Sequence, residues 1–321
     1  MGRAAVNPAR AADRTALRKR ARVRPGGRGH GPPGEPLRVR AAGVAPRRAD
    51  GLPDSMPLRH LSHLTWEEIR ALDRGHAVAI LPVGATEAHG PHLPLDTDVT
   101  IAEAMAEAGG RRLAALGVEA WLLPPLAYTP AGFAAAFPGT IDIEPDVLAS
   151  LIVGIATSLH RAGVSTFAIA NAHLDPAHLE ALHAAAGAVR DRGLVTVAFP
   201  DLTKRPWGSR LGVEFRTGAC HAGRYEGSIV LARTPERVRR EILAELPANP
   251  ASLSEAIRDG ATSFRQAGGE RAYFGWPADA TAEEGKATIE TLGGILAEAV
   301  ADVVEWDELD AIRSPQGGKD A

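Results

Sequence analysis

The feature that most constrains the fold of this chain is its alternation of short apolar segments with longer amphipathic ones. The apolar runs are typical of strands covered on both faces, and they lie at 77–83, 118–126, 165–171 and 194–199. Helical patterns precede and separate these runs, at 65–73, 97–116, 144–161 and 175–192. This rhythm predicts an α/β fold, a three-layer αβα sandwich with a mainly parallel central sheet.

Capping residues support these helix boundaries. Thr65 is a suitable N-cap, because Glu68 follows three residues later and completes a capping box. Pro176 stands at a first-turn position, where its missing N–H has no cost. Gly117 and Gly163 follow the ends of two helices, where a left-handed residue is favoured. Each predicted helix therefore has a local start or stop signal of its own.

The composition indicates a protein with a substantial core and no disulfide framework. The chain has 321 residues, of which 45% are hydrophobic, and a single cysteine. No apolar stretch reaches membrane-spanning length, and no signal-peptide core is found. We therefore expect a cytoplasmic protein without a membrane partner. Residues 56–310 are predicted to form one domain, with a short flexible tail at 311–321.

Residues 1–55 differ from the rest in charge and are predicted to be a disordered leader. They carry 13 Lys and Arg against 4 Asp and Glu, whereas the remainder carries 23 against 35. The acidic remainder argues against a nucleic-acid partner. The leader itself is open to three interpretations: a transit peptide, a nucleic-acid-binding arm, or upstream sequence translated from a misplaced start before Met56.

The densest set of polar side chains directly follows the apolar run 77–83. Glu87 and His89 are two residues apart, a spacing that points both side chains the same way in extended backbone. A segment with two prolines then leads to Asp98, although Asp96 is an alternative on spacing alone. In α/β enzymes, the carboxyl ends of strands are where the chemistry lies.

Two further polar clusters are expected at the same edge of the sheet. His173 and Asp175 follow the run 165–171 with the same spacing, and His221 and Glu226 come later in the chain. This mixed nitrogen and oxygen donor set suits Zn²⁺ or Mn²⁺ and has too little sulfur for a structural zinc site. The candidate metal ligands are Glu87, His89, Asp98, His173, Asp175 and Glu226.

The other histidines and the cysteine are interpreted as structural. His92 is expected to shape a loop, and His178 and His183 to be packing or surface residues of the helix after Asp175. Cys220 beside His221 suggests a thiol nucleophile. However, neighbours in an extended segment point apart, so adjacency argues against such a pair.

At this point the sequence resembles the creatininase (creatinine amidohydrolase) family from about residue 60 to 300. The resemblance is carried by LPVGATEAHGPHLPLDTD at 81–98 and by four shorter matches in the same order. These matches are FPGT at 137–140, NAH at 171–173, HAG at 221–223 with Glu226 and Ser228, and EEGK at 283–286 before the expected last helix.

The resemblance implies a dinuclear centre with two divalent ions per chain, Zn or Mn with Fe as an alternative, and usually a hexamer. It assigns Glu87 and His173 to one ion, His89 to the other and Asp98 as the bridge. Both Asp175 and Glu226 match positions used near the second ion. His221 matches the proton-transferring histidine of the family, which makes it the candidate catalytic residue, with Glu226 as the alternative.

The chain also departs from the family. Asn-Ala-His-Leu-Asp-Pro at 171–176 replaces the more usual Asn-Gly-His-Gly-Gly-Asn. The tryptophans that close over creatinine in the name-giving enzyme have no counterpart at 199–201 or 217–220. The resemblance therefore extends to the metal chemistry and not to the recognition of creatinine.

We interpret the chain as a metal-dependent hydrolase of a small amide or cyclic amide, with a small-molecule substrate attacked by metal-activated hydroxide. One alternative is a carbon–carbon or lactone hydrolase with the same centre. Another is a non-catalytic metal-binding accessory protein, which would hold metal without hydrolysing amides.

Overall fold

The computed structural model describes residues 57–312, so the predicted leader 1–55 and most of the predicted tail 311–321 lie outside the described residues. The described part is built on a five-stranded sheet in which all pairs are parallel, in the order β1-β3-β2-β4-β5. The strands are β1 (Arg59–His60), β2 (Ala77–Val83), β3 (Glu119–Leu122), β4 (Thr166–Asn171) and β5 (Thr196–Ala198).

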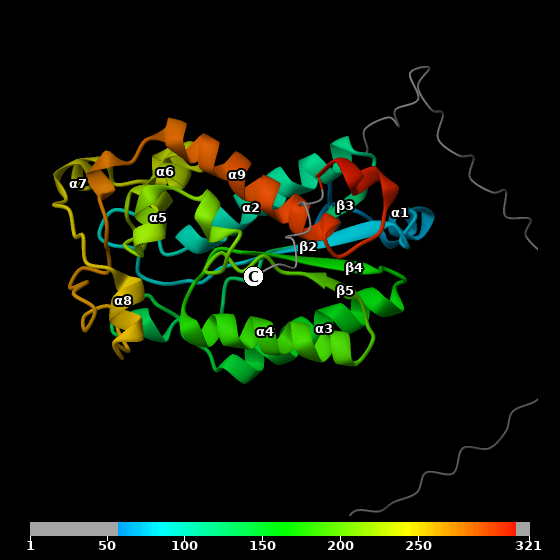
Figure 1. The fold of residues 1–321 in the computed structure, drawn as a ribbon, viewed down its shortest axis with the longest axis horizontal. Helices are drawn as coiled ribbons and strands as arrows, with labels where there is room; N and C mark the ends of the chain where they lie inside the picture. The colour runs from blue at the N-terminus through cyan, green and yellow to red at the C-terminus, as the bar shows by residue number, and fades with distance from the viewer. Residues whose placement is uncertain (1–56, 313–321) are drawn as a thin grey trace, which may run out of the picture. The chain divides into compact units, whose positions relative to one another are not determined.

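Helices cover both faces of this sheet (Figure 1). Helices α2 (Thr97–Ala115) and α9 (Ala282–Ala301) pack on one face, and α3 (Pro145–Arg161) and α4 (Pro176–Asp191) on the other. The short α1 (Trp66–Ala71) precedes β2. The prediction of an αβα fold with a parallel sheet is confirmed.

The strands supply both cores because alternate residues point to opposite faces. In β2, Val78 and Ile80 join the cluster under α2 and α9, whereas Ala79 and Leu81 join the cluster under α3 and α4. Every residue of β2 is buried. This explains why the segment reads as a continuous apolar run rather than as an alternating one.

Four helices lie together at the left end of the view in Figure 1. They are α5 (Val213–Thr217), α6 (Arg224–Arg233), α7 (Arg240–Glu245) and α8 (Leu253–Arg258). Short segments of 3-10 helix occur at Leu61–His63, Gly132–Ala134, Gly208–Arg210, Pro235–Arg237, Pro277–Asp279 and Asp307–Ile312. None of the described helices is long and apolar enough to cross a membrane.

The sequence-based boundaries differ from the structure where local chemistry intervenes. The strand predicted at 118–126 ends at Leu122, because Pro124 and Pro125 have no N–H to continue the ladder. The two-residue β1 and the helices α5 to α8 were not predicted. The EEGK segment lies in the first turns of α9 rather than before it, where Thr281 caps the helix by accepting from the backbone N–H of Glu284.

Candidate metal centre

Five of the predicted site residues meet at the carboxyl ends of β2 and β4, which are neighbours in the sheet. Glu87 and His89 lie on the loop after β2, and His173 follows β4. Asp98 and Glu226 come from the first turns of α2 and α6. All five are buried. Parallel strands and helix N-termini thus bring together side chains that are far apart in the sequence.

Asp98 lies at the centre of this group. Its Oδ1 is 3.1 Å from Nε2 of His89, and its Oδ2 is 2.9 Å from Nδ1 of His173. Oε1 of Glu87 lies 3.4 Å from the same Nδ1 of His173. Oε2 of Glu226 lies 3.4 Å from Nε2 of His89. One carboxylate therefore faces both histidines, which is the arrangement that a bridging ligand requires.

Backbone carbonyls fix which ring nitrogen of each histidine faces the cluster. Nδ1 of His89 lies 3.1 Å from the carbonyl oxygen of Glu87, and Nε2 of His173 lies 2.7 Å from that of Pro130. A nitrogen in contact with a carbonyl carries a proton, so the other nitrogen of each ring faces the carboxylates and is the one available to a metal ion. Such carbonyl contacts are common for metal-binding histidines.

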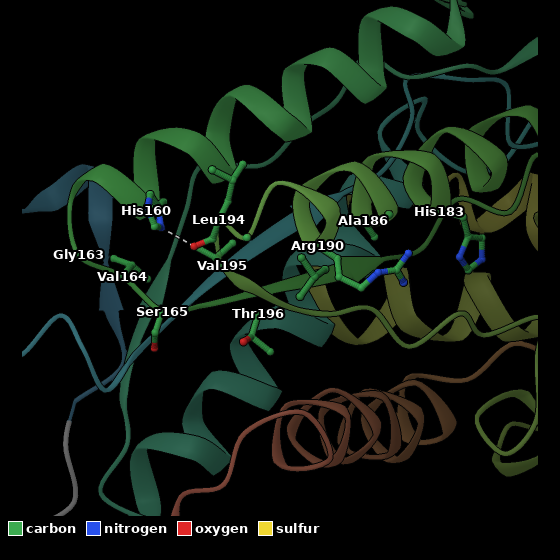
Figure 2. A pocket seen from close by; sticks show the side chains of 13 residues that line it. His160, Gly163, Val164, Ser165, His183, Ala186, Arg190, Leu194, Val195 and Thr196 are labelled. Atoms are coloured by element: carbon green, nitrogen blue, oxygen red, sulfur yellow. Dashed lines mark hydrogen bonds between the residues drawn. The ribbon is translucent and has the colours of Figure 1, made fainter.

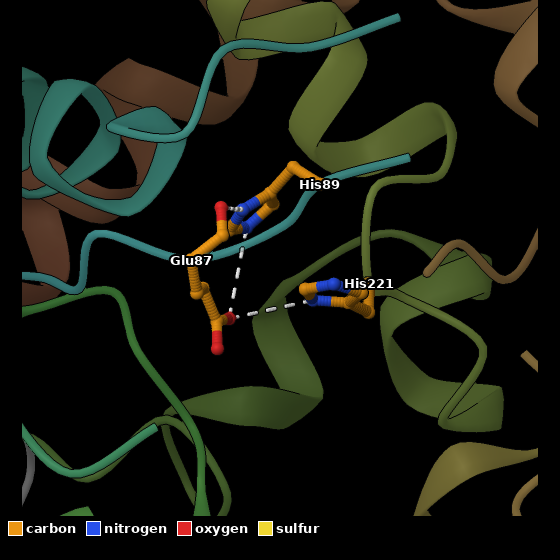
Figure 3. A group of neighbouring side chains, drawn as sticks. All are labelled: Glu87, His89 and His221. Carbon is orange, nitrogen blue, oxygen red and sulfur yellow. Dashed lines mark hydrogen bonds and ion pairs between the residues drawn. The ribbon is translucent and has the colours of Figure 1, made fainter. Parts of the chain in front are cut away.

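Histidine nitrogens this close to carboxylates share either a proton or a metal ion with them. Oε2 of Glu87 is also buried and has no hydrogen-bond partner among the described residues. Three groups of side chains could each hold an ion: Glu87, Asp98 and His173; His89, Asp98 and Glu226; and Glu87, His89 and His221. The first two groups share Asp98, and Figure 3 shows the third.

Close backbone approaches explain how the local sequence permits this geometry. A Cβ on Gly84 would lie 2.5 Å from the backbone nitrogen of Val99, so only glycine lets the end of β2 meet the start of α2. Ala222 has a φ of 50°, unusual for a residue with a Cβ. Its N–H donates to Oε2 of Glu226 at 2.6 Å, which ties the turn before α6 to the cluster.

Without metal, burial and the close charges shift the pKa values of the side chains in the cluster. Burial lowers the pKa of His89, but the carboxylates of Asp98 and Glu226 outweigh it and raise the pKa to about 10. Burial raises the pKa of Glu226 to about 8, and it also raises that of Glu87. Burial opposes ionisation of Asp98, yet the two histidines hold its pKa below the usual range. In the metal-free chain, bound protons therefore supply the positive charge that bound metal ions would supply.

His221 and Asp175, two further predicted site residues, border the cluster in different ways. Nε2 of His221 lies 3.0 Å from the carbonyl oxygen of Ala88, and its Nδ1 lies 3.8 Å from Oε1 of Glu87. Both oxygens of Asp175 accept backbone N–H groups, from Ala177 at 2.9 Å and from Phe133 at 3.2 Å. Asp175 thus caps α4 and lies outside the three groups of metal donors.

The other singled-out residues surround the centre. His178 is buried, and its Nε2 contacts Oδ1 of Asn171 at 2.8 Å. Asn171 in turn donates from Nδ2 to the carbonyl oxygen of His173 at 2.7 Å. His92 is buried against Tyr273 and belongs to none of the three groups. Burial raises the pKa of the Cys220 thiol, which is unfavourable for a thiolate nucleophile.

A wider groove of about 880 Å³ lies elsewhere, beside β5 and between the ends of α3 and α4 (Figure 2). His160, His183 and Arg190 line it, and His160 contacts the carbonyl oxygen of Leu194. None of the three groups that could hold an ion lies there. The volume of a groove alone therefore does not identify the candidate metal centre.

A small cavity directly above the cluster has walls that sequence reasoning missed. Besides Glu87, Asp98, His173, His221 and Glu226, several apolar side chains line it. They include Phe133, Leu174, Leu253, Ile257 and Phe264. Leu253, Ile257 and Phe264 come from 253–264, which carries no motif, so only the tertiary structure reveals them.

Comparison with known proteins identifies the family to which this chain belongs. The model of the family described as creatininase, creatinine amidohydrolase, matches residues 62–300. The chain belongs to the creatininase family. The resemblance found from the sequence motifs is thereby confirmed, and so is the expectation of a creatininase-family enzyme.

Individual creatininase-family relatives differ in what they act on. The chain is 34% identical to a mycofactocin precursor peptide peptidase of Mycolicibacterium smegmatis, over 65% of this chain and 78% of that protein. It is 27% identical to a creatinine amidohydrolase of Pseudomonas putida, over 58% of this chain and 76% of that protein. A solved structure of manganese creatininase has a TM-score of 0.60 at 23% identity, covering 77% of this chain and 98% of that one. This last match supports the fold.

Proposed function

We propose that this creatininase-family hydrolase cleaves a carbon–nitrogen bond of an amide with the help of two divalent ions. Glu87, Asp98 and His173 would hold one ion, and His89, Asp98 and Glu226 the other. The observation that carries this proposal is the position of Asp98, whose two oxygens face ring nitrogens of two different histidines at 3.1 and 2.9 Å. Asp175 binds neither ion in this proposal, because it caps α4.

The donor set suits zinc or manganese, with iron as an alternative, because it combines imidazole nitrogens with carboxylate oxygens and has no sulfur. Two such ions supply a water of lowered pKa and polarise the substrate carbonyl. The protein residues hold these groups in a site that excludes most bulk water, which strengthens the electrostatic interactions there.

His221 is the residue that we propose for proton transfer. Its Nε2 contacts the Ala88 carbonyl, so Nδ1 presents a lone pair toward Glu87. Burial and the nearby charge of His89 lower the pKa of His221 well below its usual range, so the ring is neutral at pH 7. A neutral imidazole can take a proton from the attacking water and pass it to the leaving nitrogen.

A peptide or another open-chain amide is a better candidate substrate than creatinine. The identity to the peptidase is higher than that to the creatinine amidohydrolase. The sequence also lacks the tryptophans that close over creatinine. A panel of peptide amides, formamides, cyclic amides, lactones and creatinine, assayed with the metal-loaded chain, would rank these classes.

Two histidine variants test the mechanism. His221→Ala should keep its metal and lose about 10²–10⁴-fold in turnover, the usual effect of removing a positioned acid–base group. His173→Ala should lose metal and activity together. A metal-depleted His221→Ala protein would instead place His221 in the coordination shell, and proton transfer would pass to Glu226 or Asp175. Two bound ions without hydrolysis of any panel member would support the accessory-protein alternative.

We also propose a homohexamer located in the cytoplasm. Val147 and Leu151 of α3 are exposed apolar side chains four residues apart, so they form a stripe on one face of the helix. Such a stripe is suited to burial between subunits. Light scattering on the purified chain measures the assembly, and a monomer at micromolar concentration would contradict it.

A further inference from the structure

The segment from Asn249 to Gly268 is a loop whose two ends are held side by side. The backbone N–H of Asn249 donates to the carbonyl oxygen of Gly275 at 2.8 Å, and the carbonyl oxygen of Asn249 accepts from the backbone N–H of Gly275 at 2.6 Å. Nδ2 of Asn249 donates to the carbonyl oxygen of Gly268 at 3.1 Å. The loop contains α8 and is thus a compact unit that leaves and rejoins the body at one point.

This loop covers the candidate metal centre. Leu253 and Ile257 of α8 and Phe264 line the cavity that also contains Glu87 and His173. The Phe264 ring lies on the His221 ring, with centroids 4.1 Å apart and an interplanar angle of 32°. The backbone N–H of Phe264 donates to the carbonyl oxygen of Phe133 across the site at 3.0 Å. The loop therefore closes the space above the proton-transferring histidine.

Among the described residues that line this space, Asp175 is the one charged side chain besides the proposed metal donors and His221. Backbone N–H groups occupy both of its oxygens. No lysine or arginine is among the described residues that line the cavity. A carboxylate or phosphate on the substrate would find no side-chain cation there, whereas an apolar group would be desolvated against Leu253, Ile257 and Phe264.

The loop must move to admit such a group. The cavity is about 50 Å³, room for one or two water molecules. Helix α8 has no fully buried residue, so lifting it breaks few apolar contacts. Gly260 and Gly268, with φ of 94° and 89°, flank the segment that carries Phe264. Helix α8 is thus held by weaker packing than the core beneath it, whereas Phe264 is buried in a cluster with Phe274.

We propose that residues 249–268 form a lid over the active site and that its apolar underside selects amides with a neutral, apolar group next to the scissile bond. This inference rests on the proposed function, because it concerns the substrate of that same centre. Residues 253, 257 and 264 determine specificity in this proposal, and closure of the lid excludes water from the reacting atoms.

Binding of hydroxamic acids tests the proposal without requiring turnover. The hydroxamate group binds metal in every member of the series, while the flanking group changes from methyl to phenyl to a carboxylate-bearing chain. With the metal-loaded full chain, calorimetry should show benzohydroxamic acid binding at least tenfold tighter than succinic acid monohydroxamate. Phe264→Ala should reduce the preference for phenyl over methyl in acetohydroxamic acid.

A charge placed on the underside of the lid should reverse the selectivity. Ile257→Lys should increase the affinity for succinic acid monohydroxamate at least tenfold and decrease the affinity for benzohydroxamic acid. Glu255→Lys is the matched control, because it adds the same ammonium group to the exposed side of α8, 70% accessible, and it should keep the wild-type order of affinities. Circular dichroism confirms that both variants fold.

The outcomes separate this inference from the proposed function. If a chain with two bound ions binds no hydroxamate, the centre is closed to substrates and the proposed function fails. If all three hydroxamates bind with equal affinity, and Ile257→Lys changes nothing, the centre is functional and the lid proposal alone is overturned.

Discussion

Oδ2 of Asp98 lies 2.9 Å from Nδ1 of His173, while the other ring nitrogen of His173 contacts the carbonyl oxygen of Pro130. This contact joins the start of α2 to the end of β4. In the metal-free chain a proton holds the two atoms together, because the burial of His173 is outweighed by the carboxylates of Glu87 and Asp98, which raise its pKa well above the usual range. A bound metal ion would take the place of that proton. The stability of the centre and its reactivity should therefore depend on the same ions.

Replacement of the bridging carboxylate should empty both metal sites. Asp98→Asn keeps the shape of the side chain but removes the charge that faces His89 and His173, so elemental analysis should find most of both ions lost. Asp96→Asn is the control, since Asp96 is only partly buried and pairs with Arg237 at 2.7 Å. Full metal content in Asp98→Asn would exclude a bridge.

Metal binding should release protons and should change how stability depends on pH. In the metal-free chain, the pKa of His89 is raised to about 10 and that of Glu226 to about 8. The folded state therefore binds more protons than the unfolded state between pH 7 and 10, where an unfolded histidine or carboxyl is deprotonated.

It follows that the metal-free chain loses stability as pH rises from 7 to 10. The contribution of His89 is fully present below its unfolded pKa of about 6.5 and disappears as pH passes about 10. The metal-loaded chain should lose less stability over this pH range, because the bound ions replace the protons. Thermal melts of both forms across this range measure the difference, and parallel curves would contradict it.

Asn171 should act as a positioning residue for His173. It donates to the His173 carbonyl oxygen at 2.7 Å, and its Oδ1 lies 2.8 Å from Nε2 of His178. Asn171→Ala should weaken metal affinity about 10–100-fold, the usual effect of losing a group that orients a metal ligand. Competition with a chelator measures this. Asn171→Asp keeps an oxygen toward His178, so it should lose less metal affinity than the alanine variant does.

Glu214 should be important for stability because it organises the start of α6. Its buried carboxylate accepts the backbone N–H groups of Arg224, Tyr225 and Trp276 at 2.9, 2.8 and 2.8 Å. Glu214→Ala leaves these donors unpaired and should lower the free energy of unfolding by about 2–4 kcal/mol in urea titrations. The exposed Glu255→Ala should change it by less than about 0.5 kcal/mol.

Much of the fold could be predicted from local patterns. The apolar run 77–83 coincides with β2, and the capping box at Thr65 begins α1 as expected. These features depend on residues that are adjacent in the sequence, so their signals are local. The two-residue β1 has no such signal. It exists because Arg59 and His60 pair with Trp121 and Leu122, which lie some sixty residues later.

The sequence by itself determined the donor types and their order, because motifs at strand ends place Glu87, His89 and His173 on one edge of a parallel sheet. Only the tertiary structure decided which side chains face one another. It placed Asp98 between the histidines, the position that the family resemblance had implied for it, placed Glu226 beside His89 and gave Asp175 to the cap of α4. It also placed residues 249–268 over the centre. That contact depends on packing between segments that are far apart in the sequence, and no local motif predicts it.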